Sequence, residues 1–230
     1  MLTPRKKITR AELKRDPLME ALYNARQFQI KHSAEIYKYG GGGLILLVLL
    51  LVGLNWRGGQ NDKAAAVAGM VAIDFSQLQY TQVIDRVPAK MEEFGGLPAF
   101  GPAVYFLARS ELIVSDTLRA EEHFALYLDD YGDDRLLRAG AYTGLGIIAD
   151  SRGLHAEAGD FYRRASQAAD TDFLRHSNAV HAGRSFILAG EPKKAVKILQ
   201  PLLDNAQFSR QLQGEAATIV ARAEVALGRM

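Results

Sequence analysis

The sequence predicts an all-α protein with an N-terminal amphipathic helix, one transmembrane helix and a C-terminal solenoid of antiparallel helix pairs. Three observations support this fold class. One long run near the N-terminus carries no charge. After residue 61, apolar residues recur at helical spacing, and no stretch alternates for long in the manner of a strand. Related residues also recur at a fixed interval of 37 to 38 positions, which is typical of repeated helix pairs.

The uncharged run has its apolar core between Leu44 and Leu54 and extends from Tyr39 to Trp56. These 18 residues would form a helix of about 27 Å, close to the ~30 Å thickness of a bilayer core. Aromatic rings at both ends suit the headgroup region. We therefore predict a membrane anchor over 39–57. Its apolar side chains are those of Leu44, Ile45, Leu46, Leu47, Val48, Leu49, Leu50, Leu51, Val52, Leu54 and Trp56.

Two other interpretations of this run stay open. A cleaved signal peptide fits the small residues of 64–68, but the preceding region is long and Arg57, Asp62 and Lys63 interrupt the segment. A buried core helix would need a larger protein around it. The glycines of 40–43 indicate either a flexible junction or a close helix–helix contact.

The charge of the chain is unevenly distributed. Residues 1–39 hold nine Lys/Arg and four Asp/Glu, whereas residues 40–230 hold 19 and 22. A basic flank predicts a cytoplasmic N-terminus and an extracytoplasmic C-terminal part, as in a single-pass protein of the bacterial inner membrane with a periplasmic domain. The acidic excess after residue 39 argues against nucleic acid as a partner. The chain has no cysteine, which excludes disulfides and Cys-ligated zinc.

The basic segment of 1–38 contains an expected helix from Leu18 to Tyr37. A possible cap at Asp16-Pro17 precedes it, and Leu18, Leu22, Ala25 and Phe28 fall near helical spacing. The helix either rests on the anionic inner leaflet or docks on a protein. The sequence does not distinguish these alternatives.

An internal repeat organises the C-terminal part. Leu145-Gly146, Gly153, Ala158 and Tyr162 align with Ala182-Gly183, Gly190, Ala195 and Leu199 at an offset of 37. An upstream unit, Leu107-Ala108, Ser115, Ala120 and Phe124, aligns at 38. Each unit places a small residue in each of two helices, with a large apolar residue four positions later to fill the space beside their contact. We expect a linker and a divergent helical pair over 58–100, three repeats over 101–207 and a capping helix over 208–230.

The repeat resembles the tetratricopeptide repeat (TPR). The residues that occupy TPR signature positions are Tyr142, Leu145, Gly146, Gly153, Ala158, Tyr162 and Ala165, whereas Ala149 and Asp170 depart from the signature. The layout of basic N-terminus, span and extracytoplasmic repeats is similar to the YfgM-like family, an ancillary subunit of the SecYEG translocon. This resemblance implies protein–protein contact at the membrane, such as delivery of translocated proteins to periplasmic chaperones.

No pattern of catalysis or ligand binding is present in the sequence. The five histidines lack metal-ligand spacing, and neither a phosphate-binding loop nor a nucleophile elbow occurs. The aspartates of 129–134 fail the spacing of a calcium loop and fit a solvated turn. We therefore expect no enzyme activity, no cofactor, no metal and no small-molecule substrate.

The expected partners are proteins, together with membrane lipids around the span. By resemblance to TPRs, first-helix residues would line a binding groove, namely Tyr105, Arg109, Leu112, Thr143, Ile147, Asp150, Val180, Arg184 and Ile187. The two arginines either pair with partner carboxylates or form ordinary ion pairs within their own repeats. The expected function is that of a protein-interaction adaptor or scaffold. The alternative is a structural accessory subunit of a large membrane complex, held by its span and N-terminal helix.

Overall fold

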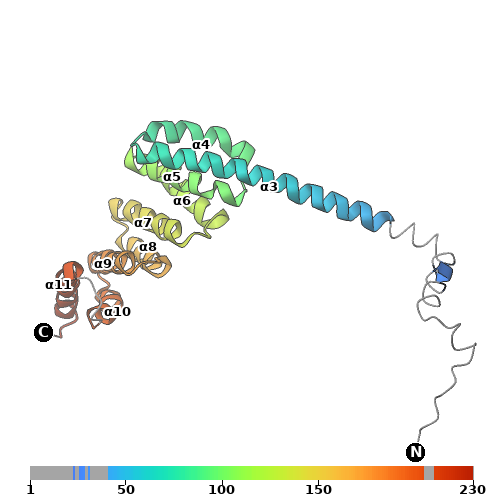
Figure 1. Ribbon diagram of the computed structural model, residues 1–230. Coiled ribbons are helices and arrows are strands. Elements are labelled where there is room, and N and C mark those ends of the chain that lie inside the picture. Colours follow the sequence, from blue (N-terminus) through green and yellow to red (C-terminus); the bar gives the residue numbers. More distant parts are fainter. Residues whose placement is uncertain (1–22, 24–25, 29–30, 32–40, 205–209, 230) are drawn as a thin grey trace, which may run out of the picture. The chain divides into compact units, whose positions relative to one another are not determined.

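A computed structural model describes residues 23, 26–28, 31, 41–204 and 210–229, without the side chains of 41–46, 53, 55–56 and 210–211. Every regular element within these ranges is helical, which confirms the all-α class (Figure 1). The chain divides into two compact units, residues 1–58 and residues 59–230. Of the expected helix over 18–37, the few described positions are helical, and the rest lies outside the described residues.

Helix α3 runs without a break from Gly41 to Ser76, so the structure has helix where a linker was expected after residue 58. A loop around Leu78 leads into α4 (Tyr80–Phe94). On the C-terminal half of α3, Ala64, Ala68 and Val71 form one buried stripe that packs in the same core as Val83 and Val87 of α4. Two packed helices therefore lie within the range 58–100, where a linker and a divergent helical pair were expected. Among the described residues, no helix has both the length and the apolar character needed to cross a membrane.

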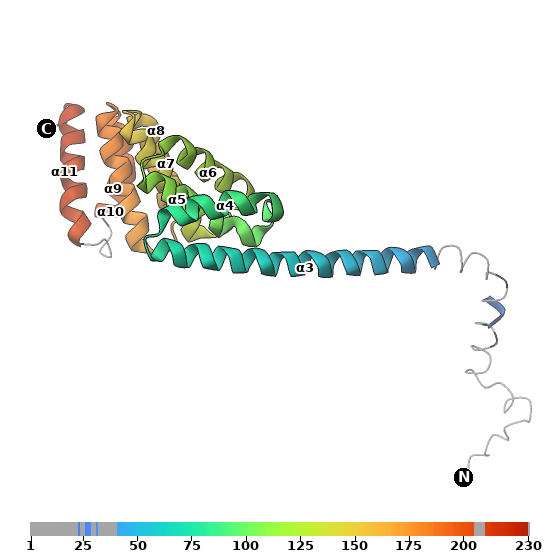
Figure 2. The same ribbon diagram turned by 90° about the horizontal axis from the view of Figure 1, so that it is seen from above.

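Three antiparallel helix pairs follow, in the region predicted to hold the repeats (Figures 1 and 2). A 3-10 turn, η2 (Pro98–Phe100), leads into the first pair. The pairs are α5 (Gly101–Ile113) with α6 (Thr117–Asp130), α7 (Arg135–Ser151) with α8 (His155–Ala168), and α9 (Asp172–Leu188) with α10 (Pro192–Leu203). Helix α11 (Arg210–Ala226) packs on α9 and α10 at the position of the expected capping helix.

The turn within each pair has the same construction. Its central residue has positive φ, with values of 68° at Ser115, 74° at Gly153 and 73° at Gly190. The amide that follows this residue donates to the carbonyl five residues earlier along the chain, as in Leu154 N to Ala149 O at 2.9 Å. This bond satisfies a carbonyl at the end of the first helix and reverses the chain. The turns fall at the offsets of 37 and 38 residues seen in the sequence.

Ser115 is the one non-glycine residue among these three turn positions, and its left-handed backbone carries a steric cost. We expect Ser115→Gly to raise the free energy of unfolding by about 1 kcal/mol, and Gly153→Ala to lower it by a similar amount. Urea denaturation followed by circular dichroism measures both. A Ser115→Gly variant no more stable than the parent would contradict this account of the turn.

Glycines allow the helices to approach one another closely. A Cβ atom at Gly146 would lie 2.8 Å from the ring of Tyr162, and one at Gly183 would lie 2.5 Å from Leu199 Cδ1. These are the small and large positions that the repeat spacing paired, so the packing inferred from the spacing is present within the second and third pairs.

Candidate functional site

The residues predicted to line a groove lie on α5, α7 and α9, and the structure separates them into three groups. Tyr105 and Val180 are buried, with exposed fractions of 5% and 2%. Leu112 and Ile187 are half-buried and pack against the core. Solvent reaches the side chains of the remaining five positions, which are Arg109, Thr143, Ile147, Asp150 and Arg184.

Tyr105 and Val180, which were predicted to line the groove, are buried between neighbouring helices. The ring of Tyr105 packs against Phe124 and Tyr127 of α6, and its hydroxyl fits against Gly140 of α7, where a Cβ would lie 2.2 Å away. Burial raises the pKa of this phenol. Val180 belongs to the core formed by α7 to α11. Both side chains stabilise the packing of neighbouring helices and cannot contact a partner directly.

Arg109 is held against aromatic rings. Its guanidinium carbon lies 5.1 Å from the ring centre of Phe75 on α3 and 6.0 Å from that of Tyr105. No ion pair to Arg109 is present among the described residues, so the prediction of an internal ion pair is not met at this position. The guanidinium lies near these rings and is hydrogen-bonded to Tyr105, and its remaining N–H groups can still bind a carboxylate.

A polar cluster centred on Asp150 joins α7, α8 and α9. One carboxylate oxygen accepts from Ser185 Oγ at 2.9 Å, and the other lies 3.0 Å from His155 Nδ1. A second link between α7 and α9 runs from Thr143 Oγ1 to Asn178 Oδ1 at 2.8 Å. Asp150 and Thr143 therefore tie two first helices together, which is a structural role that leaves part of each side chain exposed.

Arg184 forms an ion pair with Glu215, so the first helix of the third pair is linked to α11. The pair joins the third repeat to the capping helix, so it is not the intra-repeat ion pair that was expected as the alternative. The pair is substantially exposed, at 54% for Arg184 and 38% for Glu215, and exposed pairs of this kind contribute little to stability. The guanidinium can exchange Glu215 for a carboxylate of a partner at small cost.

Two aromatic residues beside this cluster have shifted pKa values. His181 and Tyr162 lie with their ring centres 5.3 Å apart. Burial lowers the pKa of His181, with Arg184 acting in the same direction and Glu215 and Asp150 opposing it. Burial raises the pKa of Tyr162, and the negative charge of Asp150 raises it further. At neutral pH both rings are therefore uncharged.

This lowered pKa makes stability depend on pH. Below the ordinary value of 6.5, the unfolded chain binds a proton at His181 more readily than the folded chain does, so the free energy of unfolding falls as the pH falls. We expect His181→Phe, which keeps a ring beside Tyr162, to lose less stability than the parent between pH 7.5 and pH 5.5. Urea denaturation at both pH values measures the difference. If the free energy of unfolding fell equally in the parent and in His181→Phe, a lowered pKa of His181 would not be the cause of the pH dependence.

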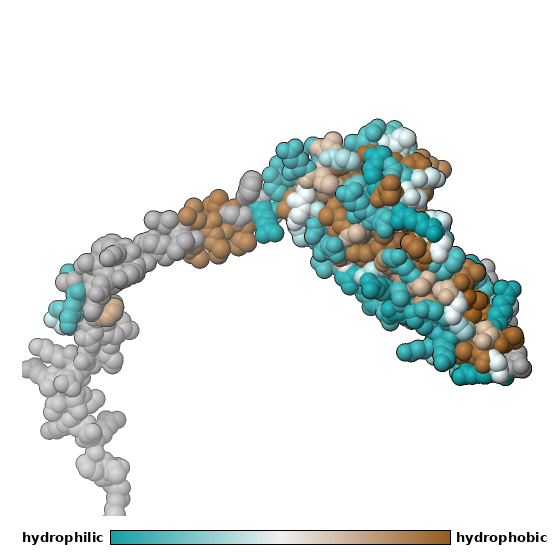
Figure 3. Space-filling view, turned by 180° about the vertical axis from the view of Figure 1, so that it is seen from behind, coloured by the Kyte–Doolittle hydropathy of each residue, from teal (hydrophilic) through white to brown (hydrophobic). Residues whose placement is uncertain are grey.

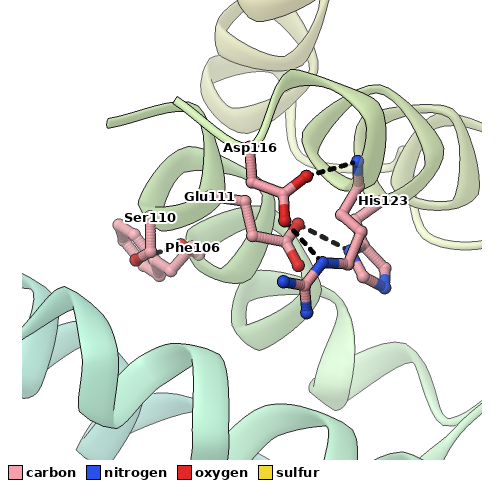
Figure 4. A network of polar contacts seen from close by, with 6 residues as sticks. Phe106, Ser110, Glu111, Asp116 and His123 are labelled. Carbon is pink, nitrogen blue, oxygen red and sulfur yellow. Dashed lines mark hydrogen bonds and ion pairs between the residues drawn. The ribbon is translucent and has the colours of Figure 1, made fainter. Parts of the chain in front are cut away.

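A buried ionisable pair, not anticipated from the sequence, lies between α5 and α6 (Figure 4). Glu111 is 1% exposed, and one of its carboxylate oxygens lies 2.7 Å from His123 Nδ1. Nearby, Asp116 caps α6 by accepting from the backbone amide of Arg119 and also pairs with its side chain at 2.6 Å. The two residues of the buried pair are 12 positions apart, a distance at which no sequence motif signals a contact.

Ser185 donates its one hydroxyl proton to Asp150, so that proton is not directed at a histidine base. In the described ranges, no three His, Asp or Glu side chains are grouped so that they could hold a metal ion. The first helices carry five predicted groove residues that solvent reaches. Arg109, Ile147 and Arg184 are exposed, whereas Thr143 and Asp150 are half-buried.

Comparison with known proteins adds no assignment. No protein-family model matches the chain, and no curated protein matches it at a significant level.

Proposed function

We propose that this protein is a single-pass membrane-anchored adaptor that binds other proteins through the exposed side chains of its first helices. The observation that carries the proposal is the stack of helix pairs. The α5, α7, α9 and α11 helices are linked in succession, by packing of Tyr105 on Gly140, by the Asp150–Ser185 bond and by the Arg184–Glu215 pair. A row of helices joined in this way is a rigid platform for extended or helical segments of a partner.

The proposed anchor is supported by an exposed apolar run on α3. Each side chain of Leu47–Val52, and that of Leu54, is at least 49% exposed. Six successive residues point to all sides of a helix, so no single packed face could cover them. A brown band in Figure 3 marks this segment. A helix that is apolar all around is suited to lipid, and the basic residues of 1–39 favour a cytoplasmic N-terminus.

The partner face combines apolar area with cations. Ile147 on α7 is 45% exposed, and Arg109 and Arg184 stand on the neighbouring first helices. Such a face suits a partner segment that has both apolar and acidic side chains, since arginine binds carboxylates through two parallel hydrogen bonds. Membrane-complex subunits and proteins crossing the membrane are the class of partner that the anchor would bring within reach. The resemblance of the layout to the YfgM-like family favours partners that take part in protein translocation or periplasmic chaperoning.

Site-specific photo-crosslinking in cells tests the adaptor function. A photoreactive amino acid at Ile147 or Arg109 should capture a defined set of proteins, identified by mass spectrometry. The matched control is Glu122, an exposed position on the second helix α6. Capture of the same proteins with equal yield from Glu122, or of none from Ile147 and Arg109, would overturn the proposed face.

The second candidate function is a structural accessory subunit of one membrane complex, and the exposed run of Leu47–Leu54 is the observation that favours it. Its contacts would come from the span and the N-terminal segment. Replacing residues 1–57 by an unrelated single-span anchor separates the candidates. An adaptor keeps its crosslinks from Ile147, whereas an accessory subunit loses its association with the complex.

A further inference from the structure

A groove of about 480 Å³ lies between the second helices α8 and α10. Phe186 of the first helix α9 lies at its base. Its floor is apolar and well fixed. Phe186 of α9 is 1% exposed, and its ring occupies the space beside Gly159, where a Cβ would lie 2.5 Å from the ring. Ile198 of α10 packs against the same core. Because the Phe186 ring is almost fully covered, the half-buried Ile198 is the apolar side chain of the groove that a partner side chain could contact.

The walls of the groove are basic. Arg163, Lys194 and Lys197 line it together with one acid, Asp160. Lys194 also lies over the Phe186 ring, with its nitrogen 5.1 Å from the ring centre. This concentration of cations is notable because residues 40–230 hold more acids than bases.

Internal ion pairs neutralise these cations only in part. Asp160 accepts from Arg163 at 3.1 Å, and Lys194 pairs with Glu191 at 2.8 Å. The Asp160–Arg163 pair is exposed to solvent, so an incoming carboxylate can replace Asp160 at small cost, whereas the Glu191 oxygen that contacts Lys194 is buried. Lys197 has no ion pair within the part of the chain that the structure describes, and its charge is available.

We propose that this groove binds an acidic segment of a partner protein, with one aromatic or large aliphatic side chain placed on Ile198. Charge complementarity decides the class of occupant, since carboxylates fit three cations around an apolar floor. The basic N-terminal segment of the chain itself would be repelled. A nucleic acid would need a longer basic face without Asp160 and Glu191 beside it. The basic residues of the groove lie on α8 and α10, whereas the cations of the proposed partner face lie on α5 and α9, so either site can be correct without the other.

Fluorescence anisotropy with the full-length protein in detergent tests this proposal. The probe is a fluorescein-labelled peptide, Glu-Asp-Glu-Phe-Leu-Glu-Asp-Glu. We expect Lys197→Glu to weaken its binding about tenfold, because attraction becomes repulsion toward several carboxylates. The matched control is Lys193→Glu, an exposed lysine on the same helix that does not line the groove, which should change the affinity less than about twofold.

Four outcomes would overturn the proposal. The first is the absence of peptide binding, and the second is equal weakening by Lys193→Glu and Lys197→Glu, which indicates a non-specific charge effect. The third is equal binding of a peptide in which glutamines replace the acids, which indicates an apolar groove without charge selection. The fourth is displacement of the peptide by a short single-stranded DNA at equal charge concentration, which indicates a general polyanion surface. Circular dichroism of each variant checks that its fold is intact.

Discussion

Replacing Gly144 by alanine is expected to lower the free energy of unfolding by about 1–3 kcal/mol. Gly144 lies on α7, where a Cβ would stand 2.4 Å from two ring carbons of Phe124 on α6. Phe124 is fully buried, so its ring cannot move away without displacing the core around it. Urea denaturation of the variant and the parent measures the loss.

A control glycine shows whether the loss of stability in Gly144→Ala comes from the contact with Phe124 or from the change of backbone entropy. Gly69 lies on α3 with nothing within 4 Å of its missing Cβ, so Gly69→Ala should stabilise the protein by about 0.5–1 kcal/mol. Combining Gly144→Ala with Phe124→Leu should cost less than the sum of the two single changes, because the shorter side chain makes room for the methyl group. A gain of stability from Gly144→Ala would show that the two helices are not in close contact there.

Removing the partner of a buried carboxylate is expected to have the largest effect. His123→Ala would leave Glu111 buried without the ring that contacts it, and breaking a buried pair in this way costs about 3–5 kcal/mol. Replacing both residues by leucine removes the carboxylate along with its partner, so the double variant should be far less destabilised than His123→Ala. Equal destabilisation of the two variants would show that the loss of stability in His123→Ala comes from the packing of His123 and not from the unpaired carboxylate.

The sequence predicts the paired helices because their packing has a period. Gly146 and Tyr162, and Gly183 and Leu199, each belong to one repeat, so aligning the units places them together. The contacts of Gly144 with Phe124 and of Gly159 with Phe186 join one pair to the next. An alignment of units compares positions within a pair, and for this reason it does not predict the contacts between pairs.

The expected linker after residue 58 illustrates a different limit. A linker was expected to begin at residue 58, yet α3 continues through Gly58 and Gly59 to Ser76. The end of an apolar run in the sequence does not show where backbone hydrogen bonding stops. The cost of about 1 kcal/mol for each glycine in a helix is small enough for neighbouring turns to offset.

The candidate site was predicted less well than the fold. First-helix positions taken from the TPR pattern include Tyr105, but Phe124 and Tyr127 of α6 and Gly140 of α7 cover its ring. Phe75 of α3 lies next to Phe106 and Arg109, and α3 belongs to a helical pair that the repeat pattern does not contain. The link between Asp150 and Ser185 and that between Arg184 and Glu215 likewise join residues more than 30 positions apart, a separation at which a single sequence carries no contact signal.

The central claim is that one lipid-crossing segment separates the N-terminal residues from the helix pairs, and cysteine labelling tests it most directly. The chain has no cysteine, so single cysteines can be introduced without background. A membrane-impermeant maleimide added to intact spheroplasts should label a cysteine at Ala217, which is exposed on α11, and should label one at Ser33 only after the membrane is permeabilised. Labelling of Ser33 but not of Ala217 before permeabilisation, or recovery of the protein in the soluble fraction, would contradict the account.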